Sequence, residues 1–229
     1  MNKGTAIFLC DFTGIMAAPW IVDGYQAILV DPQHGVDSFD GTTRKLAGTI
    51  QDKITELSAI VRNENIVFVA GFPPCTDVAV SGAAHFASKA EKDPHNQAKA
   101  ALVAEQCRMI GGLSGAPWFF ENPVSVFSSI FGKPNYSFHP YEYGGYLPED
   151  DNHPDYPGYI AARDAYPKKT CLWTGGGFVM PGKIPVACPA GFSAQHTQLG
   201  GKSLKTKNIR SATPRGFAMA VFLANSQLN

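Results

Sequence analysis

Short apolar runs recur through the first 125 residues, and acidic, glycine or proline residues follow most of them. The runs cover residues 7–10, 27–30, 66–70 and 118–120. Short apolar runs bounded by turn residues are typical of buried strands. Apolar residues recur at helical spacing over 49–63 and 96–111, and roughly a dozen residues, enough for a crossover helix, separate the first two runs. The alternation predicts an α/β fold, Rossmann-like, with a mostly parallel doubly wound sheet.

The second half of the chain has a different composition. Residues 132–195 are rich in Pro, Gly, Tyr and His and show little periodicity, which predicts a small loop-rich insertion. Helical spacing returns over 216–224, a segment expected to pack back on the sheet. A chain of 229 residues, 45% hydrophobic and 17% charged, can bury a full core, so one compact domain with an elaborated loop region is expected.

Several classes of protein are disfavoured by what the chain lacks. It has no apolar run near the roughly 20 residues that a membrane span requires, and its opening apolar stretch is too short for a signal peptide. We therefore expect a cytoplasmic protein with no membrane partner. The five cysteines show no CxxC pairing and the six histidines no HxxxH spacing, so neither a disulfide framework nor a metal site is expected.

Charge is balanced over the whole chain and unevenly distributed along it. There are 19 basic and 19 acidic residues, but residues 165–229 hold eight basic residues and no acidic one. A basic segment of this kind predicts one face that meets phosphates, with an affinity that falls as salt rises. The alternative is a lysine-rich surface that only keeps the protein soluble. The phosphate contacts expected on the first interpretation involve Lys202, Lys205, Lys207 and Arg215.

The ends of the first two predicted strands carry a candidate small-molecule site. Asp11-Phe12-Thr13-Gly14 follows the first strand and Asp31 follows the second, and ligands of open parallel sheets bind beyond such strand ends. The first turn lacks the GxGxxG pattern that cradles a pyrophosphate, so a ligand without phosphates is favoured. Asp31 is placed to accept hydrogen bonds from ribose hydroxyls. The alternative is that Asp31, which precedes Pro32, opens a turn.

The next two strand ends carry a candidate nucleophile and a candidate acid. In Gly71-Phe72-Pro73-Pro74-Cys75 two prolines stiffen the backbone just before a cysteine. Ser81-Gly82 follows in a segment suited to closing over a substrate. Glu121 comes after three aromatic residues, a setting that raises a carboxyl pKa by desolvation. Free cysteines are most often small buried hydrophobic residues, and Glu121 could simply open a turn with Asn122-Pro123. Together, however, the two groups indicate covalent chemistry.

The constellation resembles the cytosine-5 DNA methyltransferase family, and most closely its compact, phage-type members. Phe12-Thr13-Gly14 is similar to the family's first motif, Asp31 to its second-strand acid, Pro74-Cys75 with Ser81-Gly82 to its Pro-Cys motif and loop, and Glu121-Asn122 to its Glu-Asn-Val motif, with Pro123 in place of Val. Ser211 to Pro214 resembles the closing motif before a final helix. The glycine-rich part of the first motif is absent, and Lys168-Lys169-Thr170 stands where the family has Gln-x-Arg-x-Arg.

The resemblance implies a methyltransferase fold and a reaction. Residues 1–131 and 209–229 would form a catalytic domain that depends on S-adenosylmethionine, and 132–208 a small region resembling a target-recognition domain. The protein would methylate C5 of cytosine in double-stranded DNA, in a bacterial or phage-infected cell, with a protein partner possible for sequence specificity. Cys75 would attack C6 of a flipped base. Two alternatives stay open: an enzyme acting on free pyrimidine nucleotides, and an inactive DNA-binding homologue.

The expected residue roles, from the resemblance and from the charge distribution, fall into three groups. The catalytic set is Cys75, Glu121 and Lys169. The cofactor set is Asp11, Phe12, Thr13, Gly14, Asp31, Pro73, Ser211 and Thr213. The substrate set is Pro74, Ser81, Gly82, Asn122, Lys168 and the four basic residues given above for phosphate contacts.

Overall fold

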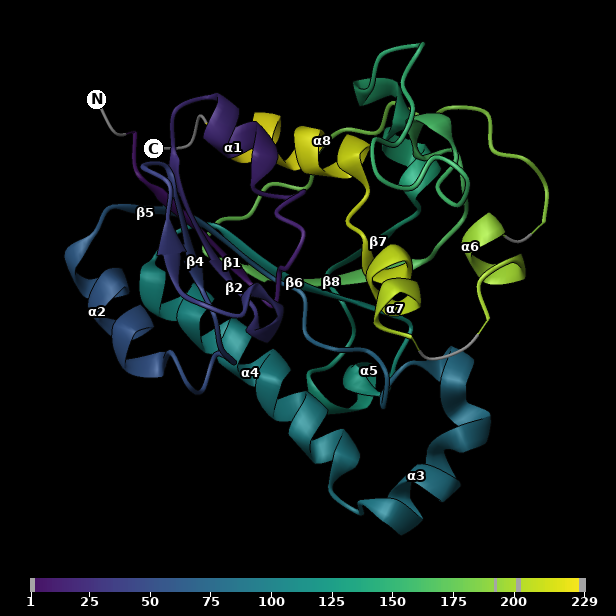
Figure 1. Ribbon diagram of the computed structural model, residues 1–229, viewed down its shortest axis with the longest axis horizontal. Helices are drawn as coiled ribbons and strands as arrows, with labels where there is room; N and C mark the ends of the chain where they lie inside the picture. Colours follow the sequence, from purple (N-terminus) through teal and green to yellow (C-terminus); the bar gives the residue numbers. More distant parts are fainter. Residues whose placement is uncertain (1–2, 192, 201–202, 227–229) are drawn as a thin grey trace.

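The protein is built on one eight-stranded mixed sheet with helices on both faces (Figure 1). The computed structural model describes residues 3–191, 193–200 and 203–226. The strand order is β3-β4-β2-β1-β5-β6-β8-β7. Strands β2, β1, β5 and β6 pair in parallel, and β4 pairs in parallel with β2. The α/β architecture predicted from the alternating apolar runs is confirmed, and it is compatible with a Rossmann-like fold.

Each predicted apolar run coincides with a central strand. The four strands are β1 (Thr5–Leu9), β2 (Gln26–Val30), β5 (Ile66–Gly71) and β6 (Trp118–Pro123). Their side chains alternate between the two faces, as a pleated strand requires. Phe8 and Phe68 contribute to one hydrophobic core, whereas Ile7 and Val69 contribute to the other. Because both faces are buried, these strands are continuously apolar rather than alternating with polar residues.

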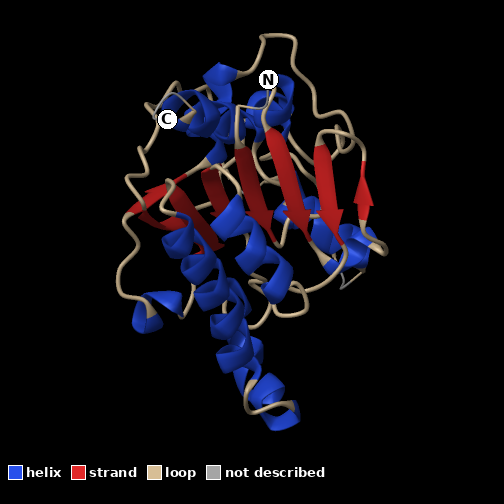
Figure 2. Ribbon diagram, turned by 90° about the vertical axis from the view of Figure 1, so that its left-hand side faces the viewer, coloured by secondary structure: helices blue, strands red, loops and turns tan. Residues whose placement is uncertain are grey.

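Two helical layers cover the sheet (Figure 2). Helices α1 (Ala18–Val22) and α8 (Arg215–Asn225) pack on one face, where Trp20 lies 5.3 Å from the ring of Phe222. Helices α2 (Ile54–Asn63) and α4 (Asn96–Ser114) cover the other face. Helix α2 starts later than the predicted residue 49, because Thr49 and Asp52 hydrogen-bond to each other and form a turn ahead of it.

Strands β7 (Tyr136–Phe138) and β8 (Thr170–Gly175) extend the same sheet beyond β6. Strand β8 is antiparallel to both β6 and β7, so the sheet is mixed at this end. The apolar run Cys171-Leu172-Trp173, which follows the two lysines at 168 and 169, predicts a strand, and it lies within β8. Both strands belong to the 132–208 stretch, so this stretch shares the main sheet. The division into a catalytic domain and a recognition-like region stays a prediction.

Shorter elements fill the connections. They are β3 (Ser38–Phe39), β4 (Thr43–Leu46), α3 (Phe86–Lys92), α5 (Phe127–Ile130), α6 (Ala194–Thr197), α7 (Leu204–Ser211) and the 3-10 turns η1 (Pro32–His34), η2 (Val80–His85), η3 (Pro140–Tyr146) and η4 (Ala162–Asp164). Among the described residues, no helix is long and apolar enough to span a membrane. Helix α8 fits closely against η3, where Tyr143 is fully buried.

We expect Gly216→Ala to destabilise the fold. A Cβ at Gly216 would lie 2.3 Å from the carbonyl oxygen of Tyr143, so α8 or η3 would have to shift, at a cost of about 1–3 kcal/mol. The matched control is Gly112→Ala, in α4, where an added Cβ meets nothing within 4 Å. The control is expected to stabilise the protein by about 0.5–1 kcal/mol through helix propensity. Urea denaturation measures both changes, and a Gly216→Ala midpoint equal to that of the wild type would contradict the expectation.

Candidate active site

The topology brings three predicted site segments to one edge of the sheet. From β1 the chain proceeds outward through β2 to β4, then returns to β5 and β6 on the other side of β1. Order reversal of this kind creates a crevice at the carboxyl ends of the strands, where ligands of open α/β sheets bind. Asp11 follows β1, Cys75 follows β5, and Glu121 lies near the end of β6. These three residues therefore lie at the same edge of the sheet, and their convergence with Asp31 on one cleft stays a prediction.

The turn after β1 is organised by Asp11. One carboxylate oxygen of Asp11 accepts hydrogen bonds from the Gly14 backbone N–H at 2.8 Å and from the Thr13 hydroxyl at 3.0 Å. The other oxygen is buried and has no hydrogen-bond partner. Burial raises the pKa of Asp11, and the nearby charge of Asp31 adds to the effect. Gly14 adopts a φ of +68°, a conformation that favours glycine.

The segment after β2 combines a turn with an exposed aromatic contact. Asp31 accepts a hydrogen bond from the Gln33 backbone N–H at 2.8 Å and caps η1. The turn-opening role considered for Asp31 is therefore present, and a ribose contact stays a prediction. The ring of Phe12, 39% exposed, lies 5.7 Å from that of His34. The two rings border the Asp11 turn on its solvent side.

Cys75 sits in the stiff loop after β5. Pro73 is buried, Pro74 is exposed, and the Cys75 side chain is half-buried against the core that faces α4. Burial raises the pKa of the Cys75 thiol, and the Glu121 carboxylate raises it further, whereas the charges of Lys168 and Arg210 oppose the shift. Burial and Glu121 thus favour the protonated thiol, whereas Lys168 and Arg210 favour the thiolate.

Glu121 lines a small pocket with three other predicted site residues, Lys168, Ser211 and Thr213. The pocket holds about 10 Å³, room for roughly one water molecule. Its lining comprises Phe72, Glu121, Phe138, Lys168, Thr170, Ser211, Ala212, Thr213, Pro214 and Phe217. Desolvation raises the pKa of Glu121, and Lys168 opposes this shift. The pocket is too small for a pyrimidine ring, so a base could reach Glu121 only if the surrounding segments move.

The two adjacent lysines lie in different surroundings. Lys168 lines the Glu121 pocket, and its ammonium group donates to the Arg210 carbonyl at 2.8 Å. Lys169 is exposed, and its charge acts on Cys171. The register explains the difference, because Glu121 pairs with Leu172 and alternate residues back to 168 share its side of the sheet. This placement favours Lys168 over Lys169 for the catalytic role.

We expect Lys168→Met to raise the pKa of Cys75. The Lys168 charge lowers the pKa values of both Cys75 and Glu121, so its removal shifts both upward. The measurement is the rate of Cys75 alkylation by iodoacetamide against pH, followed on the Cys75 peptide by mass spectrometry. The curve should move to higher pH in Lys168→Met and stay in place in the control, Lys169→Met. Equal curves for the two variants would show that Lys168 does not act on the thiol.

Sequence reasoning missed Arg210 near Cys75 and two aromatic residues of the Glu121 pocket. Arg210 was noted only as one member of the basic segment, yet its charge acts on Cys75. Phe138 and Phe217 form the apolar wall of the pocket and stack at 3.9 Å. The aromatic residues lie about 80 positions apart in sequence, so periodicity gave no signal that they meet. The basic and aromatic composition of the last third was the only available hint.

The predicted substrate contacts divide into exposed and internal groups. Lys205 and Lys207 are exposed on α7, and Ser81 is exposed in η2 beside the half-buried Gly82. Arg215 instead pairs with Asp151 at 2.6 Å, with side chains only 22% and 7% exposed. This ion pair favours an internal structural role for Arg215 over a phosphate contact. Lys202 lies outside the described residues.

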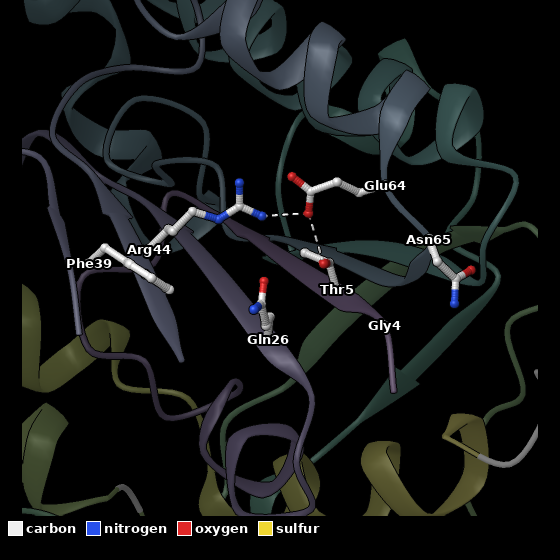
Figure 3. A pocket seen from close by; sticks show the side chains of 7 residues that line it. All are labelled: Gly4, Thr5, Gln26, Phe39, Arg44, Glu64 and Asn65. Atoms are coloured by element: carbon white, nitrogen blue, oxygen red, sulfur yellow. Dashed lines mark hydrogen bonds and ion pairs between the residues drawn. The ribbon is translucent and has the colours of Figure 1, made fainter. Parts of the chain in front are cut away.

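A second hollow lies at the opposite edge of the sheet (Figure 3). It has a volume of about 460 Å³ and lies beside the starts of β1, β2 and β5. Arg44 and Glu64 face each other across it, and the Thr5 hydroxyl donates to Glu64 at 2.9 Å. Its charged groups thus pair with one another, and none of the predicted site residues lines it.

No family model matches this sequence, and no curated protein gives a significant match. Within the described ranges, no group of three or more His, Cys, Asp or Glu side chains is placed to hold a metal ion.

Proposed function

We propose that this protein is a DNA methyltransferase that transfers a methyl group from S-adenosylmethionine to C5 of cytosine. The observation that carries the proposal is the meeting, at one sheet edge, of a thiol and a desolvated carboxyl group, with the charge of one lysine acting on both. Glu121 raises the pKa of Cys75, and Lys168 acts on both. A nucleophile, an acid and a cation are the groups that covalent activation of a pyrimidine ring needs.

The first two strand ends fit the proposed methyl donor. S-adenosylmethionine carries the methyl group on a sulfonium and has no phosphate. The unpartnered oxygen of Asp11 is a buried acceptor beside a second carboxylate, Asp31, and two negative groups suit a positively charged ligand that also carries donors. Phe12 and His34 offer ring faces next to the same turn. The turn has a single glycine, Gly14, and so does not form the pyrophosphate cradle of dinucleotide sites.

The proposed mechanism starts at Cys75. Once the Cys75 thiol has lost its proton to solvent, the thiolate adds to C6 of the target cytosine, and the π electron pair of the C5–C6 double bond moves onto C5 and the ring. Glu121, whose pKa is raised by desolvation, donates a hydrogen bond to N3 in its protonated form and stabilises this charge. C5 then takes the methyl group from the sulfonium. Loss of the C5 proton to a base restores the double bond, and the Cys75 thiolate leaves from C6.

Access to the base requires movement around the site. Cytosine C6 is shielded within a duplex, so the base must be flipped out, at a cost of a few kcal/mol. Residues of η2 and α3, directly after the Cys75 loop, include no buried residue. This segment contacts the loop through Lys89, which pairs with Asp77 at 3.0 Å and donates to the Thr76 carbonyl. A segment attached so lightly is suited to closing over a bound base.

The phosphate contacts are proposed on α7. Lys205, Lys207 and Arg210 are exposed on this short helix, which leads directly into the pocket residues Ser211 and Thr213. Exposed cations next to the site would bring a polyanion to it, with an affinity that falls steeply with salt.

The proposal is tested by transfer of label from methyl-labelled S-adenosylmethionine to cytosine-containing duplex DNA at two salt concentrations. Label on C5 of cytosine, with less transfer at the higher salt, supports it. Deoxycytidine monophosphate serves as the alternative acceptor in a parallel reaction. Label on the free nucleotide alone would favour a nucleotide-modifying enzyme, and salt-sensitive DNA binding without transfer would favour an inactive binding protein.

A further inference from the structure

The loop that carries Cys75 is fastened to the segment after Glu121 by three hydrogen bonds. Two are formed by the backbone: Val80 N–H donates to the Val124 carbonyl at 2.9 Å, and Val126 N–H donates to the Val78 carbonyl at 3.0 Å. The third is formed by a side chain, since Asn122 Nδ2 donates to the Pro73 carbonyl at 3.0 Å. Only this third bond can be deleted by a side-chain substitution, and it is the one closest to Cys75 in sequence.

Asn122 is placed for this contact and not for a substrate. Its side chain is 1% exposed, and it does not line the Glu121 pocket. Asn122 pairs with Cys171 across β6 and β8 and lies next to Glu121 in β6, so the two neighbouring side chains point to opposite faces of the sheet. The Pro73 carbonyl can only accept a hydrogen bond, which fixes the amide nitrogen of Asn122 on that side. The amide oxygen on the other side is buried without a partner.

We infer that Asn122 is a positioning residue that couples the nucleophile to the acid. Pro73 is two residues before Cys75, and Glu121 is one residue before Asn122. One hydrogen bond therefore ties the strand that carries the acid to the stiff loop that carries the thiol. Because proline residues occupy 73 and 74, a displacement of the Pro73 carbonyl is transmitted to Cys75 with little relaxation between them. The role of Asn122 in methyl transfer rests on the proposed function, whereas its role in placing the thiol rests on its hydrogen bond to Pro73.

The test compares Asn122→Ala and Asn122→Asp with a matched control, Asn225→Ala. Asn225 is also fully buried and also donates to a backbone carbonyl, that of Val179 at 3.0 Å. It lies at the end of α8, next to Ser226, whose carbonyl binds the Tyr25 hydroxyl near the start of β2, away from the Cys75 edge. Loss of stability, followed by thermal unfolding, is expected in both alanine variants. A change at Cys75 is expected only in the Asn122 variants.

Two readouts separate positioning from mere stability. The first is alkylation of Cys75 by iodoacetamide without DNA, followed on its peptide, which should change severalfold in Asn122→Ala and stay at the wild-type rate in Asn225→Ala. The second is steady-state methyl transfer, where a misplaced thiol should lower kcat by about 10²-fold and leave KM for S-adenosylmethionine unchanged. In Asn122→Asp the carboxylate cannot donate to Pro73, so kcat relative to wild type should recover as pH falls and the acid becomes protonated.

The alkylation arm does not require methyltransferase activity. A protein without transfer activity would overturn the proposed function, while a changed Cys75 alkylation rate would still support the positioning role. A Cys75 alkylation rate in Asn122→Ala equal to the rate in Asn225→Ala would overturn the positioning role. A raised KM for DNA with an unchanged kcat would also overturn it, because that pattern belongs to a substrate contact. If Asn122→Ala does not fold, Asn122→Asp, which keeps the size of the side chain, supplies both readouts.

Discussion

Replacing Cys75 with alanine is expected to abolish methyl transfer, with a loss on the order of 10⁴-fold or more. The proposed reaction depends on a covalent bond from the Cys75 sulfur to C6, and Cys75 is the cysteine whose pKa Glu121, Lys168 and Arg210 all affect. Cys107 and Cys171 are buried in the core, and burial raises the pKa values of both thiols. The fold should survive the substitution, because Cys75 is only half-buried.

The measurement combines label transfer with detection of the covalent complex. Wild-type protein incubated with S-adenosylmethionine and duplex DNA containing 5-fluorocytosine should form an adduct that survives denaturation, because fluorine at C5 cannot leave as a proton does. Cys75→Ala should form none. The control is Cys188→Ala, a half-buried cysteine in the loop beyond β8, which should behave as wild type. Transfer by Cys75→Ala at more than a few per cent of the wild-type rate would rule out the covalent mechanism.

Replacing Glu121 with glutamine should lower kcat by about 10²–10⁴-fold, the range for removal of a positioned acid. The amide keeps the size of the side chain and loses the proton that stabilises charge on the ring. Desolvation raises the pKa of Glu121, so the wild-type acid stays protonated at pH values above its ordinary range. Activity that needs this proton is present below the raised pKa and is lost as pH rises through it.

The pH–rate profile is the decisive measurement for Glu121. The wild type should lose activity on the alkaline side as Glu121 ionises, and on the acid side as the Cys75 thiolate is protonated. Glutamine does not titrate, so the limb assigned to Glu121 should be missing from Glu121→Gln. Glu105→Gln is the control, because Glu105 pairs with Arg108 on the surface of α4. A Glu121→Gln profile with both limbs intact would assign the alkaline limb to another group.

Sequence reasoning succeeded where burial on both faces made a strand continuously apolar. Residues 27–30 and 66–70 are buried in the structure as their apolar sequence predicted. The ends of β1, β5 and β6 then place Asp11, Cys75 and Glu121 at the same edge of the sheet. Sequence reasoning could not resolve β7, which has only three residues, or the full extent of β8, because both lie among Pro, Gly and Tyr residues. Local pattern identified strand-like character at 171–173 but not the partner, β6, about 50 residues away in sequence.

The choice between neighbouring residues depended on register, which sequence alone did not contain. Lys168 and Lys169 are chemically identical, and only the pairing of Glu121 with Leu172 decides which of them reaches the pocket. The same pairing turns Asn122 toward Pro73 and away from the substrate side. Arg215 was counted among free surface charges, because its partner Asp151 lies 64 positions earlier. Long-range partners of this kind determine whether a cation is available to a ligand.

The position of β8 between β6 and β7 also has a consequence for synthesis of the chain. Strand β6 begins with the aromatic run Trp118-Phe119-Phe120. The outer edge of β6 is covered by β8, which pairs with all six residues of β6. Until residue 175 has left the ribosome, that edge presents unpaired backbone groups beside exposed aromatic side chains, the combination that promotes intermolecular strand pairing. A fragment ending at residue 131 would keep this edge open permanently. The loop-rich third of the chain therefore also protects the nascent protein from aggregation, by closing the sheet that the first half begins.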